Sequence, residues 1–421
     1  MARQIHKKFT NEQVKDIVSR YLNGEIKRKH VQTILGIGKT RFFALIKEYR
    51  LNPDNFSVDY KRTKATRIVA PTIEKNIIKE LESTKKFIDN KDIPIYSYNY
   101  SFIRNDLKNK YHQKVSLSTI IRKAKKFGFY LGKLKKRKAH DREVITNHIG
   151  ELIQHDSSFH LWSPHVKDKW WLITSLDDYS RYLLYALLVL RDTSLAHIRS
   201  IQTTFLRFGL PLNFYVDCDS IFRFVRNRDE IHYRHHLQTN ETIPQWKQIC
   251  QECKVNVIHA LSPQAKGKAE RPYGWIQDHL VRICAREDIT TITQANRVLS
   301  REVYEYNYKR IHSTTNEIPY LRYQRAIEEK KNLFRQFLVP PPYQSIKDIF
   351  CFRLKRIVDS YRTVSINNLK LRFNNAPIHR EVVLRIYPYS KSDLSEVRFW
   401  YQGKLLDVQK IKNELLKPVH F

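Results

Sequence analysis

Cysteines, acidic residues and long apolar runs are all scarce in this sequence, and each shortage excludes a class of protein. No apolar run is long enough to span a membrane, and residues 1–8 lack the apolar segment of a secretion signal. The 5 cysteines are irregularly spaced, which is typical of a reducing compartment. Cys250 and Cys253 have the spacing of half a zinc site, but no second half lies at a suitable distance. We therefore expect a cytoplasmic protein without a zinc site.

Acidic residues are far outnumbered by basic ones. There are 76 Lys and Arg against 42 Asp and Glu, which gives a formal net charge of +34. A surplus of this size predicts a polyanionic partner, most often nucleic acid. The charge is spread along the chain rather than gathered on one amphipathic helix, which argues against a membrane-surface role. At 421 residues, two to four domains are expected.

Residues 1–52 predict a helix-turn-helix DNA-binding domain. A capping box precedes the first of three expected helices, and a glycine turn separates the second from the third: 10–22, 25–35 and 41–49. Lys39, Thr40 and Arg41 open the third helix, the end that enters the major groove in a helix-turn-helix. A three-helix bundle without a ligand is the alternative, and the charge of the chain favours DNA.

Residues 71–131 predict a second helix-turn-helix domain, after a polar and basic linker. Apolar residues recur at helical spacing in two helices, and the segment 115–119 caps a third helix that Gly128 ends. This third helix carries three residues expected to contact DNA: Ser118, Arg122 and Lys123. The basic run at 133–138 would then follow the phosphates of the same DNA.

From residue 148 onward, short strands alternate with helices. The expected strands are 151–159, 170–176, 182–190, 213–216 and 254–259, with helices at 194–208, 244–253, from 269 and at 292–308. This order predicts an α/β domain, a mixed sheet flanked by helices. The polar stretch 226–242 is interpreted as an insertion or loop.

Three acidic residues lie at the ends of these elements. Asp156 and Asp217 end expected strands, and Glu270 lies in the first turn of the helix that follows the last strand. Strand-end acids can converge at one edge of a mixed sheet. Oxygen ligands without a histidine or cysteine cluster favour Mg²⁺ or Mn²⁺ over zinc. Taken alone, Glu270 is better explained as a solvated acid favoured by the helix dipole, so the metal hypothesis depends on all three carboxylates.

Five ordered motifs within residues 148–325 resemble those of DDE transposases, the integrase and transposase branch of the ribonuclease-H-like superfamily. The motifs are Gln154-His-Asp156, Asp177-Asp-Tyr-Ser-Arg181, Tyr215-Val-Asp217-Cys-Asp-Ser-Ile-Phe222, Ser262-Pro-Gln-Ala-Lys-Gly-Lys-Ala-Glu270-Arg and Tyr306-Asn307-Tyr-Lys-Arg310-Ile-His312. Together they are far more specific than any one alone, and they are most similar to bacterial insertion-sequence transposases.

The resemblance implies that residues 148–330 form a ribonuclease-H-like catalytic core. It also implies an activity on DNA. The acids matching Asp156, Asp217 and Glu270 would bind two Mg²⁺ (or Mn²⁺) ions, cut double-stranded DNA at the ends of a mobile element and join the 3′-OH to target DNA. The N-terminal domains would bind the terminal inverted repeats, and a homo-dimer or larger homo-oligomer would assemble on the DNA in the bacterial cytoplasm. Three further cations would contact phosphates near the cut site: Lys266, Lys268 and Arg271.

The chain departs from the family pattern at the second acid. Asp219 follows Asp217 closely and is a rival to it, although the strand-end position favours Asp217. The interval from Asp217 to Glu270 is also longer than in compact family members. Asp177 and Asp178 are interpreted as turn formers with Arg181 as a structural partner, and His155 as a neighbour that shapes the site rather than a ligand.

Beyond the core, a helix at 322–337 and a stiff proline-rich spacer at 339–342 are expected. Short alternating runs then predict a small β-barrel over residues 345–421, with strands at 363–366, 369–373, 381–386 and 396–401. The resemblance implies that this module binds DNA or contacts another subunit.

Two other functions fit parts of the sequence. A non-catalytic, sequence-specific DNA-binding regulator would need only the two helical domains. A tyrosine recombinase would use the His279-Leu-Val-Arg282 pattern with one of three nearby tyrosines: Tyr304, Tyr306 or Tyr308. The recombinase hypothesis leaves the three acids unexplained.

Overall fold

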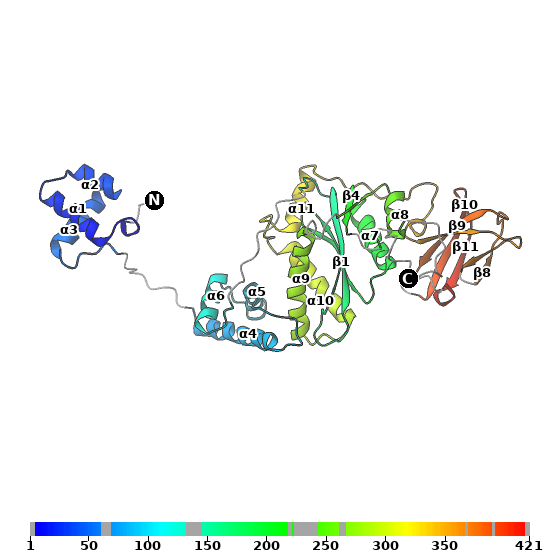
Figure 1. Cartoon of the computed structure of the whole chain (residues 1–421), viewed down its shortest axis with the longest axis horizontal. Coiled ribbons are helices and arrows are strands. Elements are labelled where there is room, and N and C mark those ends of the chain that lie inside the picture. Colours follow the sequence, from blue (N-terminus) through cyan, green and yellow to red (C-terminus); the bar gives the residue numbers. More distant parts are fainter. Residues whose placement is uncertain are drawn as a thin grey trace. The chain divides into compact units, whose positions relative to one another are not determined.

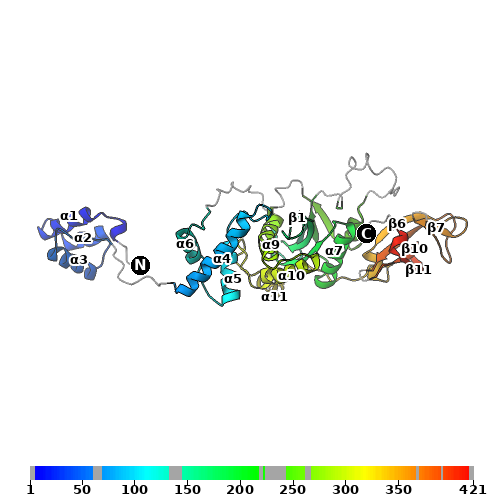
Figure 2. The same cartoon turned by 90° about the horizontal axis from the view of Figure 1, so that it is seen from below.

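The computed structural model describes residues 5–59, 69–131, 145–217, 221–222, 243–260, 267–366, 369–389 and 392–416, with only the backbone described for 267–273. The chain divides into two compact units, Met1–Glu74 and Lys75–Phe421, and each is described by itself. Figures 1 and 2 show the elements in two views. Within the described residues, no helix combines the length and the apolar character needed to cross a bilayer.

The first unit contains the three predicted helices around one apolar core. They are α1 (Asn11–Leu22), α2 (Arg28–Leu35) and α3 (Lys39–Leu51). Thr10 caps α1 and forms the predicted capping box with Gln13, because each side chain accepts from the other's backbone N–H. Gly36 ends α2 with a φ of 65°, a left-handed conformation that glycine adopts without strain. The helix-turn-helix assignment itself stays a prediction.

Three further helices follow, of which the first begins just before the boundary between the two units and the other two lie in the second unit. They are α4 (Pro71–Asp89), α5 (Tyr100–Tyr111) and α6 (Leu117–Lys126). Within the predicted capping segment 115–119, Ser116 caps α6 by accepting from the backbone N–H of Thr119 at 3.2 Å. Phe102 of α5 belongs to the same apolar cluster as Ile276 and Leu280, which lie further along the chain. The boundaries proposed for a separate domain at 71–131 stay predictions.

A five-stranded mixed sheet forms the centre of the second unit, with strand order β3-β2-β1-β4-β5. The strands are β1 (Leu152–His160), β2 (Trp170–Asp177), β3 (Leu183–Val189), β4 (Asn213–Val216) and β5 (Asn256–His259). β1 pairs antiparallel with β2 and parallel with β4, so it lies at the centre of the sheet. The predicted mixed sheet with helices is confirmed.

Helices cover both faces of this sheet (Figure 1). They are α7 (Ser194–Phe208), α8 (Gln245–Glu252), α9 (Gly267–Arg286), α10 (Ile292–Tyr308) and α11 (Pro319–Glu328). Ile153 and Phe214 of the sheet share one apolar cluster with α7 and α8. Leu172 and Leu176 share another with α9 and α10. Alternate strand residues therefore pack against different helix layers.

The C-terminal part is a four-stranded antiparallel sheet with strand order β11-β10-β9-β6, next to a hairpin of β7 and β8. The elements are α12 (Ile346–Ile349), β6 (Phe352–Ile357), β7 (Thr363–Ile366), β8 (Leu369–Arg372), β9 (Glu381–Pro388), β10 (Leu394–Tyr401) and β11 (Lys404–Lys412). In the described residues the end strands β6 and β11 do not pair, so the sheet is open and the predicted closed barrel is not confirmed.

The expected helix at 322–337 is wrong in its second half. α11 ends at Glu328, and the following backbone pairs with the core instead. Leu210 and Arg335 exchange two backbone hydrogen bonds, at 2.7 and 2.9 Å. Gly209 permits this approach, since a Cβ there would meet the carbonyl oxygen of Arg335 at 2.5 Å. Val339 packs against the main apolar cluster, so the proline-rich segment is not a spacer between separate modules.

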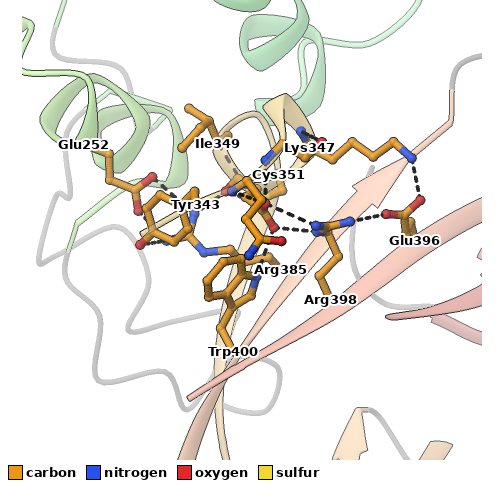
Figure 3. A network of polar contacts seen from close by, with 12 residues as sticks. Glu252, Tyr343, Lys347, Ile349, Cys351, Arg385, Glu396, Arg398 and Trp400 are labelled. Carbon is orange, nitrogen blue, oxygen red and sulfur yellow. Dashed lines mark hydrogen bonds and ion pairs between the residues drawn. The ribbon is translucent and has the colours of Figure 1, made fainter. Parts of the chain in front are cut away.

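A buried group of ions joins α8 to the C-terminal sheet (Figure 3). Glu252 of α8 accepts from Arg353 of β6 at 2.6 Å and from Arg385 of β9 at 2.7 Å. Both arginine side chains are only 4% exposed. Burial opposes ionisation of Glu252, but its hydrogen bonds with Arg353 and Arg385 outweigh burial and lower its pKa. The C-terminal sheet is thus attached to the core by oppositely charged side chains, each of which would be costly to bury without its partner.

Replacement of Glu252 by alanine should destabilise the protein by about 3–5 kcal/mol, because it leaves two buried guanidinium groups without their carboxylate. Chemical denaturation of the full chain measures this loss. Glu381→Ala is the matched control, because Glu381 pairs with Lys355 at 3.5 Å on the surface and should contribute about 1 kcal/mol or less. Equal losses in the two variants would contradict the buried-pair interpretation.

Acid should weaken the C-terminal sheet through Glu396. Burial opposes its ionisation, but bonds from Lys347 at 2.6 Å, Tyr389 and Arg398 at 2.7 Å lower its pKa to about 2. A carboxylate with a lowered folded pKa contributes stability above its unfolded pKa and loses it as pH falls toward the folded value. Thermal unfolding from pH 5 to pH 2 should therefore show a smaller loss in Glu396→Gln than in wild type. Parallel losses would refute this.

Candidate active site

Asp156 lies on β1, and Asp217 directly follows the neighbouring parallel strand β4. The register of β1 and β4 pairs Gln154 with Tyr215; Asp156 comes two residues later within β1, and Asp217 comes two residues later, just after β4 ends at Val216. Residues two apart in a strand share a face, and paired strands lie about 4.8 Å apart. Continuing the register therefore places the two aspartates side by side on one face of the sheet.

Helix α9 covers this face. Ser158, two residues after Asp156 on β1, accepts a hydrogen bond from the side chain of Gln277 in α9 at 3.2 Å. His165, in the connection that follows β1, lies 3.1 Å from the carbonyl oxygen of Ala285 near the end of α9, so β1 and α9 advance in the same direction. The start of α9 consequently lies toward the part of β1 that carries Asp156.

Glu270 is in the first turn of α9, which begins at Gly267. It comes seven positions before Gln277, a distance of about 10 Å along a helix. Asp156 comes two positions before Ser158, about 7 Å along a strand. The helix backbone therefore carries position 270 toward the end of the sheet where the two aspartates lie, while the Glu270 side chain is outside the described part of the structure.

The two aspartates are suitable for a divalent ion. Carboxylate oxygens on adjacent strands are the ligands that Mg²⁺ and Mn²⁺ prefer. Among the side chains that the structure describes, which exclude Glu270, no three His, Cys, Asp or Glu residues are grouped to hold a metal. A third carboxylate for such a site would thus have to come from side chains outside the described part of the structure, among them Glu270 and Asp219.

The second acidic motif forms the turn between β2 and β3. Asp177 is fully buried and accepts from the backbone N–H groups of Gly150 at 2.9 Å and Ser180 at 2.8 Å. Burial raises its pKa to about 6 despite these bonds. Asp178 accepts from Arg181 at 2.8 Å, so the predicted structural role of Arg181 is confirmed.

His155 is fully buried and lies on the face opposite Asp156. Its Nδ1 lies 2.9 Å from Oγ of Ser175, and its Nε2 lies 2.8 Å from Nδ1 of His197 in α7. The imidazole ring of His155 also stacks on the indole ring of Trp246 in α8, with 5.6 Å between the ring centroids. His155 is therefore a buried neighbour of Asp156 whose side chain is held by other residues of the core. The sequence did not single out His197 as part of this group.

The residues predicted to contact DNA are placed as follows. Lys39, Thr40 and Arg41 form the first turn of α3 and are exposed. On α6, Ser118 and Arg122 are exposed and Lys123 is half-buried. Lys266 and the rival acid Asp219 lie outside the described residues, as do the side chains of Lys268 and Arg271. Their roles in binding stay predictions.

The residues of the recombinase pattern make structural contacts. His279 lies 3.2 Å from Glu302 of α10, and Arg282 donates to the carbonyl oxygen of Ser97 at 2.6 Å. Tyr306 is 2% exposed, and burial raises its pKa strongly. A buried phenol that resists ionisation is a poor nucleophile, so the structure argues against Tyr306 in this role, whereas Tyr304 is 51% exposed.

No family model matches the chain, but two bacterial proteins are similar to it. The protein y4bF of Sinorhizobium fredii, whose name describes it as a transposase, is 25% identical over 260 residues, 61% of this chain and 51% of that protein. The transposase for insertion sequence IS1202 of Streptococcus pneumoniae is 25% identical over 172 residues, 41% of this chain and 35% of that protein. The chain resembles bacterial transposases. The predicted resemblance is thus confirmed, and the chain spans about half the length of the first relative and about a third of the second.

Solved structures of retroviral integrases are also similar to this transposase-like chain. The catalytic core domain of BIV integrase has a TM-score of 0.31 and 18% identity, covering 43% of this chain and 98% of that one. A chain of the simian T-cell lymphotropic virus intasome in complex with PP2A regulatory subunit B56 gamma has a TM-score of 0.34 and 12% identity. The match covers 73% of this chain and 95% of that one. Scores this low carry no argument about the function of the present chain.

Proposed function

We propose that the protein is a DNA transposase. It binds the terminal inverted repeats of a mobile element, cuts DNA at the ends of the element and joins the 3′-OH to target DNA. The observation that supports this best is the register of β1 and β4, whose continuation would bring Asp156 beside Asp217 on the face that α9, the helix carrying Glu270, covers. The similarity to bacterial transposases points to the same chemistry.

In this proposal the three acids Asp156, Asp217 and Glu270 hold two Mg²⁺ or Mn²⁺ ions. Such ions, when bound, activate a water or a 3′-OH and stabilise the leaving oxygen of the phosphodiester. The chain itself then needs no nucleophilic side chain; it binds and orients the DNA. Three cations near the acids would hold the phosphates on either side of the scissile bond: Lys266, Lys268 and Arg271.

The helices before the core would provide specificity for the element ends. The first turn of α3 carries exposed Lys39, Thr40 and Arg41, and α6 carries exposed Ser118 in its first turn and exposed Arg122 further along, which suits insertion of a helix into the major groove. The net charge of +34 would strengthen phosphate binding along the rest of the chain. Because both ends of an element must be held together, we propose that a homo-dimer or larger homo-oligomer assembles on the DNA.

Removal of one acid should abolish cutting without abolishing binding. Asp156→Asn, Asp217→Asn and Glu270→Gln keep side-chain size but remove a charge that holds the metal. Each should slow cleavage of a labelled element end in Mg²⁺ by at least about 100-fold, since even residues behind metal ligands cost 10- to 100-fold. Asp219→Asn is the matched control and should retain cleavage.

The same assay separates the alternatives. Loss of cleavage in Asp219→Asn but not in Asp217→Asn would transfer the second acidic role to Asp219. Specific binding by wild type without cleavage in Mg²⁺ or Mn²⁺ would identify a DNA-binding regulator instead. A covalent protein–DNA adduct formed without metal would identify a recombinase.

Arg41→Ala and Arg122→Ala should each weaken binding to the element end by about 1–3 kcal/mol if the arginine contacts a base. If the arginine contacts only a phosphate, its removal should instead reduce the slope of log affinity against log salt concentration by about one. Fluorescence anisotropy at several salt concentrations measures both effects. Arg50→Ala is the control, because Arg50 lies in the last turn of α3, away from the end expected to enter the groove. An equal loss in Arg50→Ala would contradict the proposed orientation.

A further inference from the structure

The four residues that flank Asp156 on β1 are all held by side-chain hydrogen bonds. Each bond reaches a different part of the fold. The pairs are Gln154 with Asp178, His155 with His197, Ser157 with Asp192, and Ser158 with Gln277. The strand is therefore fixed on both of its faces and on both sides of the acidic position.

Two of these four residues, His155 and Ser157, are connected to one carboxylate on the face opposite Asp156. Oδ1 of Asp192 lies 2.7 Å from Nε2 of His197, and Oδ2 accepts from the hydroxyl of Ser157 at 2.9 Å. Asp192 lies between β3 and α7, next to Thr193, which caps α7. A single carboxylate thus connects the residue after Asp156 directly, and the residue before it through one histidine.

With one proton on each imidazole, a single arrangement satisfies all the bonds. The carboxylate of Asp192 can only accept, so Nε2–H of His197 donates to it. Nδ1 of His197 then accepts from Nε2–H of His155 at 2.8 Å, and Nδ1 of His155 accepts from the hydroxyl of Ser175 at 2.9 Å. The carboxylate sets the direction of the whole chain of bonds.

This chain of bonds lies in the core, away from water. His155, Ser175 and His197 are fully buried, and Asp192 is 11% exposed. Buried polar groups are costly unless every member is bonded, and apolar side chains of similar size often stabilise a core as well or better. A contribution to stability therefore gives little reason to bury this hydrogen-bonded group. A role in fixing the geometry of β1 beside Asp156 gives a better one.

We propose that Asp192 and His197 are positioning residues for Asp156. They hold His155 and Ser157 from behind the sheet, and residues that alternate along a strand point to opposite faces. The backbone at position 156 is thereby fixed without any contact to the Asp156 carboxylate itself. The inference rests on the proposed function, because it assigns the network to the metal-binding geometry of that site.

Asp192→Asn tests the proposal in the full-length protein. An amide carries no charge and has one acceptor oxygen, so it can still accept from His197 but must reverse its bond with the hydroxyl of Ser157, and both charge-assisted bonds become weaker neutral ones. The dissociation constant for Mn²⁺, measured by calorimetric titration, should rise about 10- to 100-fold, as is usual for residues that orient metal ligands. The Mg²⁺ concentration for half-maximal end cleavage should rise by a similar factor, while affinity for the element end stays unchanged.

Two further variants separate positioning from folding. Ser157→Ala removes one hydroxyl and should weaken Mn²⁺ binding in the same direction but less, with an unchanged thermal midpoint. Asp288→Asn is the matched control, because Asp288 also lies beside a histidine, 3.4 Å from His165, but its side chain is 85% exposed. Metal binding in this control should equal that of wild type. Where Asp192→Asn fails to fold, Ser157→Ala decides.

The outcomes distinguish the two levels of the argument. Folded Asp192→Asn and Ser157→Ala proteins that bind Mn²⁺ as wild type does would overturn the positioning role and leave the transposase proposal intact. A wild-type protein that neither binds Mn²⁺ nor cuts the element end would overturn both.

Discussion

The parallel pairing of β1 with β4 is the constraint on which the candidate site depends. Side chains on paired parallel strands lie level with one another, so two acids at matching positions need no further device to approach. The pairing itself depends on packing from both sides, because Ile153 and Phe214 enter one apolar cluster while Leu152 and Tyr215 enter another. A slip of one residue in β1 would exchange these faces and move Asp156 into the layer of α7.

Much of this frame could be predicted from local sequence patterns. Helix 194–208 and strand 213–216 have the predicted bounds, because their apolar spacing agrees with their burial in the fold. The helix expected at 322–337 fails where local pattern and long-range pairing disagree: the backbone of Arg335 bonds with Leu210, far away in the sequence. Closure of a barrel is equally non-local, and so the open C-terminal sheet could not be predicted from the runs that form its strands.

The candidate site divides in the same way. Asp156 and Asp217 were predictable because a family motif marked both and a strand end marked Asp217, but the expected strand end at Asp156 is wrong, since β1 continues to His160. The network behind Asp156 was not predictable. His155 and His197 are separated by a β-hairpin, and neither position shows a pattern that indicates its partner. A hydrogen bond between two buried histidines becomes visible only when the helix and the strand are placed.

Helix α8 connects this network to the C-terminal sheet. Its first turn contributes Trp246, which stacks on His155, and its last residue is Glu252, which is held by Arg353 and Arg385. At 8 residues the helix is about 12 Å long, so the two contacts lie within one short rigid element. A change that loosens the C-terminal sheet would therefore weaken the contacts of Glu252 at one end of α8. Through Trp246 at the other end, it would also weaken the packing against the His155 ring. The C-terminal sheet thus belongs to the frame that supports β1, in addition to any contact it makes with DNA or a second subunit.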